Sequence, residues 1–433
     1  MRDLIVALIV FGLLPIALYR PAVGIYLWSW IGYMNPHRLG WGFAYNFPFA
    51  AVVGAVTIIG FLFYKRPKKL PICALTVMMI IFIIWMTITS FMSIRSSEVV
   101  FAQWDKVIKI QLVIFLTLMI IKSREELNIL IWIVVLSLGF YGVKGGLFTL
   151  MTGGNYMVIG PPGTFIEGNT TLALALIMIL PLMRYLQLIE TRKWIRWGLI
   201  LAMVLTAVAI VGSHSRGALL AGGAIAFFLW LKSPKKALIG LGTAIFIPLV
   251  LMFMPEHWFE KMDTISSYDE DASAMGRINT WWFAFNLAVD HPIFGGGFNV
   301  FTPDLFHVYA PDPYDFHDSH SIYFEILAEH GFIGLAIFLM LALLGWRLAA
   351  KIKKRTKKDE ANHWARDLAA MIQVSLVGYL VGGAFLGLAY YDLYYHLLAM
   401  LIITNHILNM AEQEPVNDKA GGVIKRTSVG GRK

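Results

Sequence analysis

The sequence predicts an all-α, polytopic membrane protein with about 12 transmembrane helices. Of its 433 residues, 58% are hydrophobic and 15% are charged, and the mean hydropathy is +0.67. Soluble domains carry about 25% charged residues, and one soluble core could not bury this much apolar surface. Apolar runs of about 20 residues, long enough to cross a bilayer, recur along nearly the whole chain.

Eleven predicted spans are continuous, and they lie at 47–64, 71–93, 102–121, 127–151, 169–189, 195–212, 217–231, 237–254, 321–346, 367–388 and 392–410. Residues 4–33 are also apolar but are interrupted by Pro15, Arg20 and Pro21. They form either one long span or a short hairpin, and we expect one span with Arg2 on the inside. No small-residue cleavage site follows, so we expect an uncleaved anchor.

The basic residues predict the orientation. They cluster in loops that an even number of predicted spans separates, so these loops share one face. By the positive-inside rule this face is cytoplasmic, and the net charge of +9 therefore indicates topology rather than nucleic-acid binding. The basic residues of these clusters are Lys65, Arg66, Lys68, Lys69, Lys122, Arg124, Arg192, Lys193, Arg196, Lys232, Lys235, Lys236, Lys351, Lys353, Lys354, Arg355, Lys357, Lys358 and five in the tail.

The chain is expected to divide into an N-terminal bundle at 1–254, an outer loop region at 255–320, C-terminal helices at 321–411 and a cytoplasmic tail at 412–433. The loop region holds eleven acidic residues but only two cations, Lys261 and Arg277. Within it, residues 278–289 predict an amphipathic helix at the membrane interface, and residues 291–300 predict a turn rich in glycine.

Several motifs in the outer loop region suggest chemistry only weakly. Asp269-Glu270-Asp271 has the D-x-D pattern of nucleotide-sugar transferases, but it lies on the outer face and follows no βα unit, so a solvated turn is expected. His317 and His320 lack an H-E-x-x-H spacing and a third strong ligand. The glycines at 295–297 lack the strand–helix context of a phosphate loop. We therefore expect no metal and no cofactor.

Three other residues are harder to explain as purely structural. Arg216 begins a span on the outer face, where a cation is costly unless it snorkels or binds an anion. Arg277 stands in a strongly acidic loop, and His320 lies where the chain re-enters the membrane. The predicted topology places all three at one depth on one face. The alternative is that the arginines snorkel and the histidine caps a helix.

Three blocks around these residues carry a family resemblance. Ser215-Arg216-Gly217-Ala218 resembles the S-R-G-A signature of the O-antigen ligase and polymerase superfamily. Gly276-Arg277, followed by the glycine-rich turn from His291-Pro292, and the segment 320–335 are also similar to that family. The opening stretch 33–38 (YMNPHR) resembles the ligase branch found beside exosortase systems. Many relatives carry Asn after the histidine, where this chain has Ser321.

This resemblance implies a GT-C-like helical fold in the bacterial inner membrane, with the outer loops in the periplasm. It implies metal-independent, inverting transfer of a glycan from undecaprenyl diphosphate to a hydroxyl of lipid A-core, another glycan or a protein. Arg216 and Arg277 would bind the diphosphate, because guanidinium groups fork onto phosphate oxygens. His320 would take the acceptor's proton. Further candidate substrate contacts are Ser215, His214, Glu167, Asn169 and His317.

Two other functions are consistent with parts of this pattern. A polymerase would use another lipid-linked repeat as its acceptor, and the motifs do not separate it from a ligase. A flippase or transporter of lipid-linked glycans would favour polar residues at mid-span and an inverted repeat, whereas the polar cluster here lies at one face. The sequence therefore favours a ligase.

Overall fold

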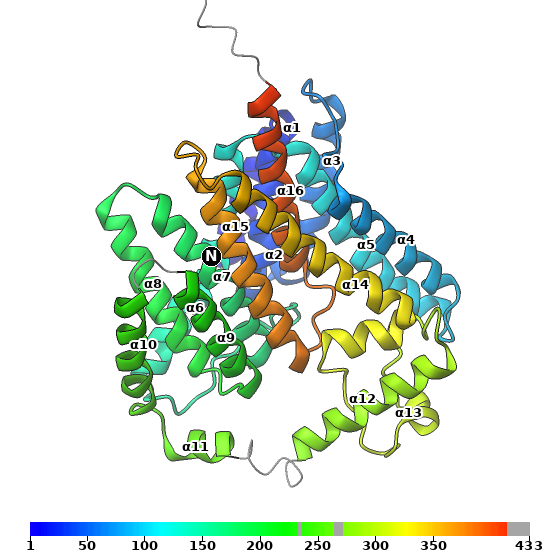
Figure 1. The fold of residues 1–433 in the computed structure, drawn as a ribbon. Coiled ribbons are helices and arrows are strands. Elements are labelled where there is room, and N and C mark those ends of the chain that lie inside the picture. Colours follow the sequence, from blue (N-terminus) through cyan, green and yellow to red (C-terminus); the bar gives the residue numbers. More distant parts are fainter. Residues whose placement is uncertain (233–235, 264–271, 414–433) are drawn as a thin grey trace, which may run out of the picture.

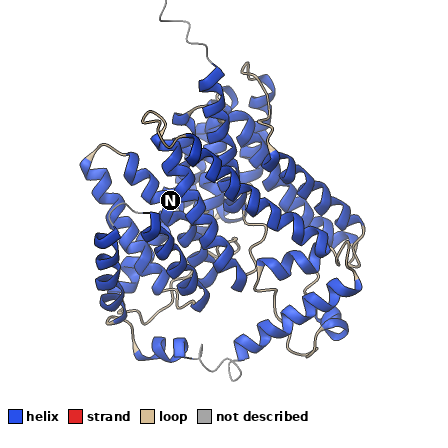
Figure 2. Cartoon of the chain, viewed as in Figure 1, coloured by secondary structure: helices blue, strands red, loops and turns tan. Residues whose placement is uncertain are grey.

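The computed structural model describes residues 1–232, 236–263 and 272–413. The fold is all-helical, and within these ranges the only β pairing is an isolated bridge between Gly160 and Gly168 (Figure 2). The helices are α1 Arg2–Tyr19, α2 Pro21–Met34, α3 Phe49–Phe63, α4 Ala74–Phe91, α5 Ser97–Ile120, α6 Arg124–Met151, α7 Asn169–Ile189, α8 Lys193–Val211, α9 Arg216–Lys232, α10 Lys236–Leu251, α11 Glu256–Asp263, α12 Ala272–Asp290, α13 Pro303–Tyr309, α14 Ile322–Arg355, α15 His363–Gly382 and α16 Asp392–Gln413.

The predicted spans correspond to helices, and the prediction for 169–189 coincides with α7. In the part of the chain that the structure describes, seven helices are long and apolar enough to cross a membrane: α1, α4, α6, α7, α8, α14 and α15. The chain is therefore a multi-pass membrane protein. The interior of the bundle contains α7, α15 and α16, whose side chains are largely buried.

The prediction of one span across residues 4–33 is wrong, because the chain reverses at Arg20. Pro21 has no amide hydrogen to continue α1 and instead occupies the first position of α2. Asp3 Oδ1 accepts hydrogen bonds from the amides of Gly42 and Ala44, both 3.2 Å long, so the start of α1 lies beside the chain that follows α2. The two helices therefore form an antiparallel hairpin, and Arg2 lies at the opposite end of the bundle from Arg20.

The basic loops meet at one end of the bundle, as the sequence predicted. Lys122 Nζ donates to the carbonyl of Lys69 at 2.8 Å, and Arg355 bonds to Glu412 near the end of α16. The Arg124 guanidinium lies 5.2 Å from the centre of the Trp364 ring, which joins these two groups. Figure 1 shows the α14–α15 connection and the end of α16 at the top.

The loop region lies at the other end of the molecule, where Figure 1 shows α11, α12 and α13 at the bottom. The predicted helix at 278–289 is confirmed and is part of α12. Its inner face packs Phe283, Ala284 and Leu287 against Phe306 and Val300. The sequence motif at 269–271 and the tail from 414 lie outside the described residues.

Candidate functional site

A small cavity of about 190 Å³ at this end of the bundle brings together residues that are far apart in the sequence. Arg277 at the start of α12 and His320 just before α14 both line it. So do residues 167–171 at the start of α7, together with Phe385 and Leu386 from the turn after α15. Four of the predicted site residues therefore meet at one cavity: Arg277, His320, Glu167 and Asn169.

Asn279 fixes the segment that leads to His320 against α12. Its Nδ2 donates to the carbonyls of Asp312 and Asp315 at 2.8 and 2.9 Å, and its Oδ1 accepts from the Asp312 amide at 2.8 Å. The Asn279 side chain is buried. These three bonds use three of the four hydrogen bonds that its amide group can make. Because Asn279 lies two residues after Arg277, these bonds fix the segment at 312–315, which leads to His320, beside the start of α12.

His320 occupies an unusual backbone conformation and an environment that favours the neutral ring. Its φ is +42°, in the left-handed region that residues other than glycine seldom adopt. Burial and the positive charge of Arg277 lower the pKa of His320 from its ordinary value of 6.5, while the Asp318 carboxylate acts in the opposite direction. A neutral imidazole can accept a proton, which is what a general base requires.

The outer loop at 152–168 is held in shape by the two residues predicted to contact sugar. Glu167 Oε2 accepts a hydrogen bond from the Gly163 amide at 2.7 Å, and Asn169 Nδ2 donates to the Ser213 carbonyl at 2.7 Å. The Gly160 amide donates to the Gly168 carbonyl at 3.0 Å, which closes the loop. Both side chains therefore line the cavity while also fixing its wall.

Arg216 begins α9 close to the cavity but is not among the residues that line it. A side chain at the next position, Gly217, would lie 3.0 Å from Cβ of Phe385, which does line the cavity. The carbonyl of Ser213, three residues before Arg216, accepts a hydrogen bond from Asn169 Nδ2. The Arg216 backbone is thus fixed beside two cavity residues, and its side chain is half-buried.

Three other predicted contacts have structural partners. His214 is buried, with its Nε2 at 2.9 Å from the Gly154 carbonyl oxygen. Ser215 Oγ accepts from the Ala218 amide at 3.3 Å and caps α9. His317 Nε2 pairs with Asp315 Oδ1 at 2.8 Å. None of these three lines the cavity.

A second cavity, of about 340 Å³, adjoins the first and was not predicted from the sequence. The two cavities share Thr171, His320 and Leu386. The second one is polar and adds Arg95, Val99, Asn299, Phe301, Thr302, Asp318, Ser319, Glu325, Glu329 and Gly387. Acidic residues inside a predicted span were the signal, because carboxylates are costly there and mark functional positions.

Glu329 belongs to a buried polar network behind this second cavity. Its Oε1 accepts from the Asn299 amide at 2.8 Å, and its Oε2 accepts from the Tyr390 hydroxyl. The same hydroxyl lies 2.8 Å from Nε2 of His330, whose Nδ1 lies 2.7 Å from the Thr89 hydroxyl. A fully bonded buried network of this kind fixes its members in one arrangement.

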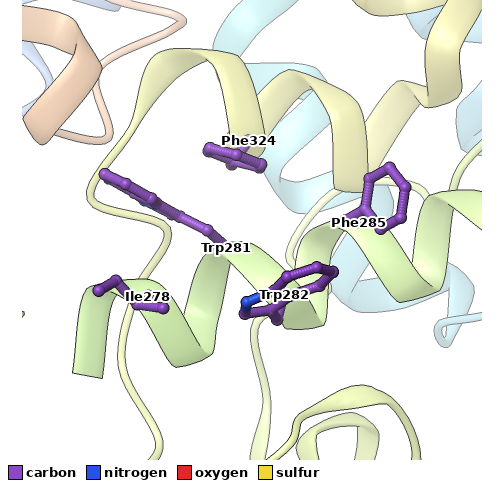
Figure 3. Close-up of a pocket in the computed structure, with 5 residues that line it drawn as sticks. All are labelled: Ile278, Trp281, Trp282, Phe285 and Phe324. Carbon is purple, nitrogen blue, oxygen red and sulfur yellow. The ribbon is translucent and has the colours of Figure 1, made fainter. Parts of the chain in front are cut away.

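An apolar groove of about 270 Å³ begins one residue after Arg277. It is lined by Ile278, Trp281, Trp282, Phe285 and Phe324, which Figure 3 shows on two facing helices. Trp281 stacks on Phe324, with ring centres 5.2 Å apart. Trp282 and Phe285 are 52% and 41% exposed, which is typical of a surface that contacts lipid or an apolar ligand.

Within the described ranges, no group of three His, Cys, Asp or Glu side chains lies close enough together to hold a metal ion. The His317 ring contacts Asp315 Oδ1 and is not among the residues that line the cavity. The expected absence of a metal or cofactor therefore stays a prediction, because the D-x-D residues 269–271 lie outside the described chain.

Comparison with known families is consistent with this site. Residues 201–339 match the family model described as O-Antigen ligase, and this range holds Arg216, Arg277 and His320. Residues 1–191 match a family described as one of unknown function, DUF5935. No curated protein matches the chain. The match at 201–339 supports the O-antigen ligase and polymerase superfamily for this chain.

Proposed function

We propose that the protein is an O-antigen ligase of the bacterial inner membrane, with its site on the periplasmic face. It would transfer a glycan from undecaprenyl diphosphate to a hydroxyl of lipid A-core or of another acceptor. The observation that carries this proposal is the cavity that Arg277 and His320 line together. A fixed cation and a neutral base on one cavity are what transfer from a diphosphate to a hydroxyl requires.

The donor diphosphate would bind to Arg277, with Arg216 as the second guanidinium. Two such groups can fork onto phosphate oxygens and stabilise the negative charge that develops as the diphosphate leaves. The groove beside Arg277 would take the first isoprenoid units, because it is apolar and starts at the next residue. Its exposed aromatic rings would lie at the membrane interface, where such side chains are enriched.

The reaction would then be a single displacement. The acceptor hydroxyl oxygen attacks the anomeric carbon, its proton passes to the neutral His320 ring, and the bond from that carbon to the diphosphate oxygen breaks. The electron pair of that bond leaves with the diphosphate, and attack from the opposite side inverts the anomeric configuration. Glu167 and Asn169 would contact the transferred sugar from the loop that forms the cavity wall.

In vitro transfer tests this proposal and separates its alternatives. Purified protein is mixed with a purified undecaprenyl diphosphate-linked glycan and EDTA, and either lipid A-core or a second lipid-linked repeat is supplied as the acceptor. A ligase glycosylates lipid A-core, whereas chain growth on the lipid-linked repeat would indicate a polymerase. Movement of the donor across a vesicle membrane without any transfer would favour a transporter. Activity that EDTA abolishes and magnesium or manganese restores would contradict the metal-free mechanism.

A further inference from the structure

The second cavity has a different charge from the one that Arg277 lines. Three carboxylates lie on its wall, from Asp318, Glu325 and Glu329, with a single cation, Arg95. Arg95 NH1 is already paired with Asp304 Oδ2 at 2.8 Å. Glu329 is buried, which disfavours its ionised form, so Asp318 and the partly exposed Glu325 are the acidic groups that a diphosphate would meet. Because Arg95 is already paired, a diphosphate placed here would meet these groups without a free cation among the lining residues and would be disfavoured.

Sugar hydroxyls have the opposite preference. A hydroxyl donates to an ionised carboxylate, and such charge-assisted bonds are stronger than neutral ones. Glu325 is well placed for this role, because its Oε2 accepts from the Ala389 amide at 3.0 Å while no described residue bonds to its Oε1. Asp318, which is exposed, offers a second carboxylate close to His320, as its effect on that ring indicates.

The cavity wall is rigid enough to select among ligands. Glu329 is 4% exposed and is held by the Asn299 amide and the Tyr390 hydroxyl. Gly387, which also lines the cavity, leaves no room for a larger residue, because an added Cβ would lie 2.6 Å from Ser319 Oγ. A site whose groups are already held in place loses little entropy when it binds a ligand.

We propose that this second cavity is the acceptor subsite, and that it selects an uncharged sugar with neighbouring free hydroxyls over an acidic sugar. Glu325 and Asp318 are the residues that recognise those hydroxyls. This inference rests on the proposed glycosyl transfer and assigns the donor and the acceptor to opposite sides of His320. The anionic donor lies on the Arg277 side of His320, the hydroxylated acceptor lies on the acidic side, and the shared histidine stands between them.

The test measures acceptor and donor parameters separately with the purified full-length protein. The donor is the undecaprenyl diphosphate-linked glycan, and the two acceptors are lipid A-core ending in a neutral hexose and the same core ending in a hexuronic acid. The wild type should prefer the neutral core. Glu325→Gln should raise KM for the neutral core by about 10- to 100-fold, the effect of one charge-assisted hydrogen bond. The same variant should reduce the discrimination against the uronic acid and leave donor affinity unchanged.

Two further variants complete this experiment. Asp318→Asn alters an exposed side chain, so it tests the subsite even if Glu325→Gln is unstable, and it should also raise KM for the neutral core. Glu98→Gln, at an exposed acidic residue in the first turn of α5, should change none of these parameters.

The results that would contradict the acceptor subsite differ from those that would contradict the proposed function. An unchanged acceptor KM in both cavity variants, or a loss confined to donor affinity, would overturn the acceptor subsite while leaving glycosyl transfer intact. A wild-type protein that binds the donor but glycosylates neither core would overturn the proposed function and the subsite together.

Discussion

Arg277 affects the site in two ways at the scale of single residues. Its charge would hold the donor diphosphate, and the same charge lowers the pKa of His320. Burial acts in the same direction and more strongly. The histidine is therefore neutral at neutral pH before substrate binds, which is the form that accepts a proton.

Replacing either arginine by lysine should not preserve activity. Lysine keeps the charge but loses the planar fork that binds two phosphate oxygens. Arg216→Lys and Arg277→Lys should each reduce the rate of transfer by about 30- to 1000-fold, the effect of losing one stabilising contact to the leaving group. Single-turnover rates on purified variants measure this loss.

The matched control is Arg192→Lys, at an exposed arginine at the opposite end of the bundle, which should transfer at the wild-type rate. Full activity of either site variant, at normal levels in the membrane, would remove that arginine from the diphosphate site.

The pH dependence of kcat/KM tests His320 as the base. Because its pKa is lowered in the free enzyme, the acid limb of the profile should lie below about 6.5, the unperturbed value. Activity should be complete above that limb and fall as the ring becomes protonated. His320→Gln should lower turnover by about 100- to 10,000-fold and abolish the limb, with little change in donor affinity.

A different role for His320 would give a different result. If the ring only donates a hydrogen bond to phosphate, the glutamine variant keeps a donor and should retain much of the turnover. An acid limb that persists in this variant, or weak donor binding with near-normal transfer, would leave His320 a binding residue.

At the scale of elements, α14 is interrupted where it meets the glycine-rich turn. Gly331 has φ +69° and ψ −174°, a conformation that is accessible almost only to glycine. Across this break, the amides of Gly296 and Gly297 donate to the carbonyls of Ala328 and Glu329 at 2.8 and 2.9 Å. The turn from 291 to 300 therefore anchors the first segment of α14, which carries Glu325 and Glu329 into the second cavity.

Gly331→Ala should damage both stability and transfer. The added methyl group would lie 2.4 Å from the Ile293 carbonyl oxygen, and the backbone would be strained by about 1 to 3 kcal/mol. The thermal unfolding midpoint in detergent should fall, and the acceptor KM should rise. Gly12→Ala in α1 is the control, because nothing lies within 4 Å of its added Cβ. Equal unfolding midpoints in the two variants would contradict a structural requirement for glycine at 331.

At the scale of the whole molecule, the two ends of the bundle differ in their charge and in the cavities that they hold. The basic loops meet at one end, and the two cavities with α11, α12 and α13 lie at the other. The hairpin of α1 and α2 places Arg2 at the end that holds the cavities. We infer that this end is periplasmic, since positively charged loops remain in the cytoplasm.

Cysteine labelling in intact cells tests this orientation. In a Cys73→Ser background, which removes the one native cysteine, Arg2→Cys should react with a membrane-impermeant maleimide from outside. Lys68→Cys, in a basic loop, should react only after the membrane is opened. Labelling of Arg2→Cys only after permeabilisation would restore the single span across residues 4–33.

The sequence by itself determined the helices, the shared end of the basic loops and the residues with unusual chemistry. Apolar runs fix helical spans because the bilayer requires every backbone group to be bonded within the segment. The sequence also identified Arg277 and His320, because one of only two cations in a strongly acidic loop and a histidine at the predicted membrane boundary are unusual at those positions. The sequence around Arg20-Pro21 could not show whether these residues bend one helix or reverse the direction of the chain.

Only the tertiary structure decided which of these residues share a cavity. Asn279 fixes the backbone at Asp312 and Asp315, shortly before His320, against α12, and Arg95 lines the second cavity from just before α5. Both arrangements depend on packing between segments distant in sequence. For the same reason His214, Ser215 and His317 lie outside both cavities, although they neighbour the key residues in the chain. The order of residues along the chain does not determine which side chains come into contact. Long-range packing and buried hydrogen bonds between distant segments determine that.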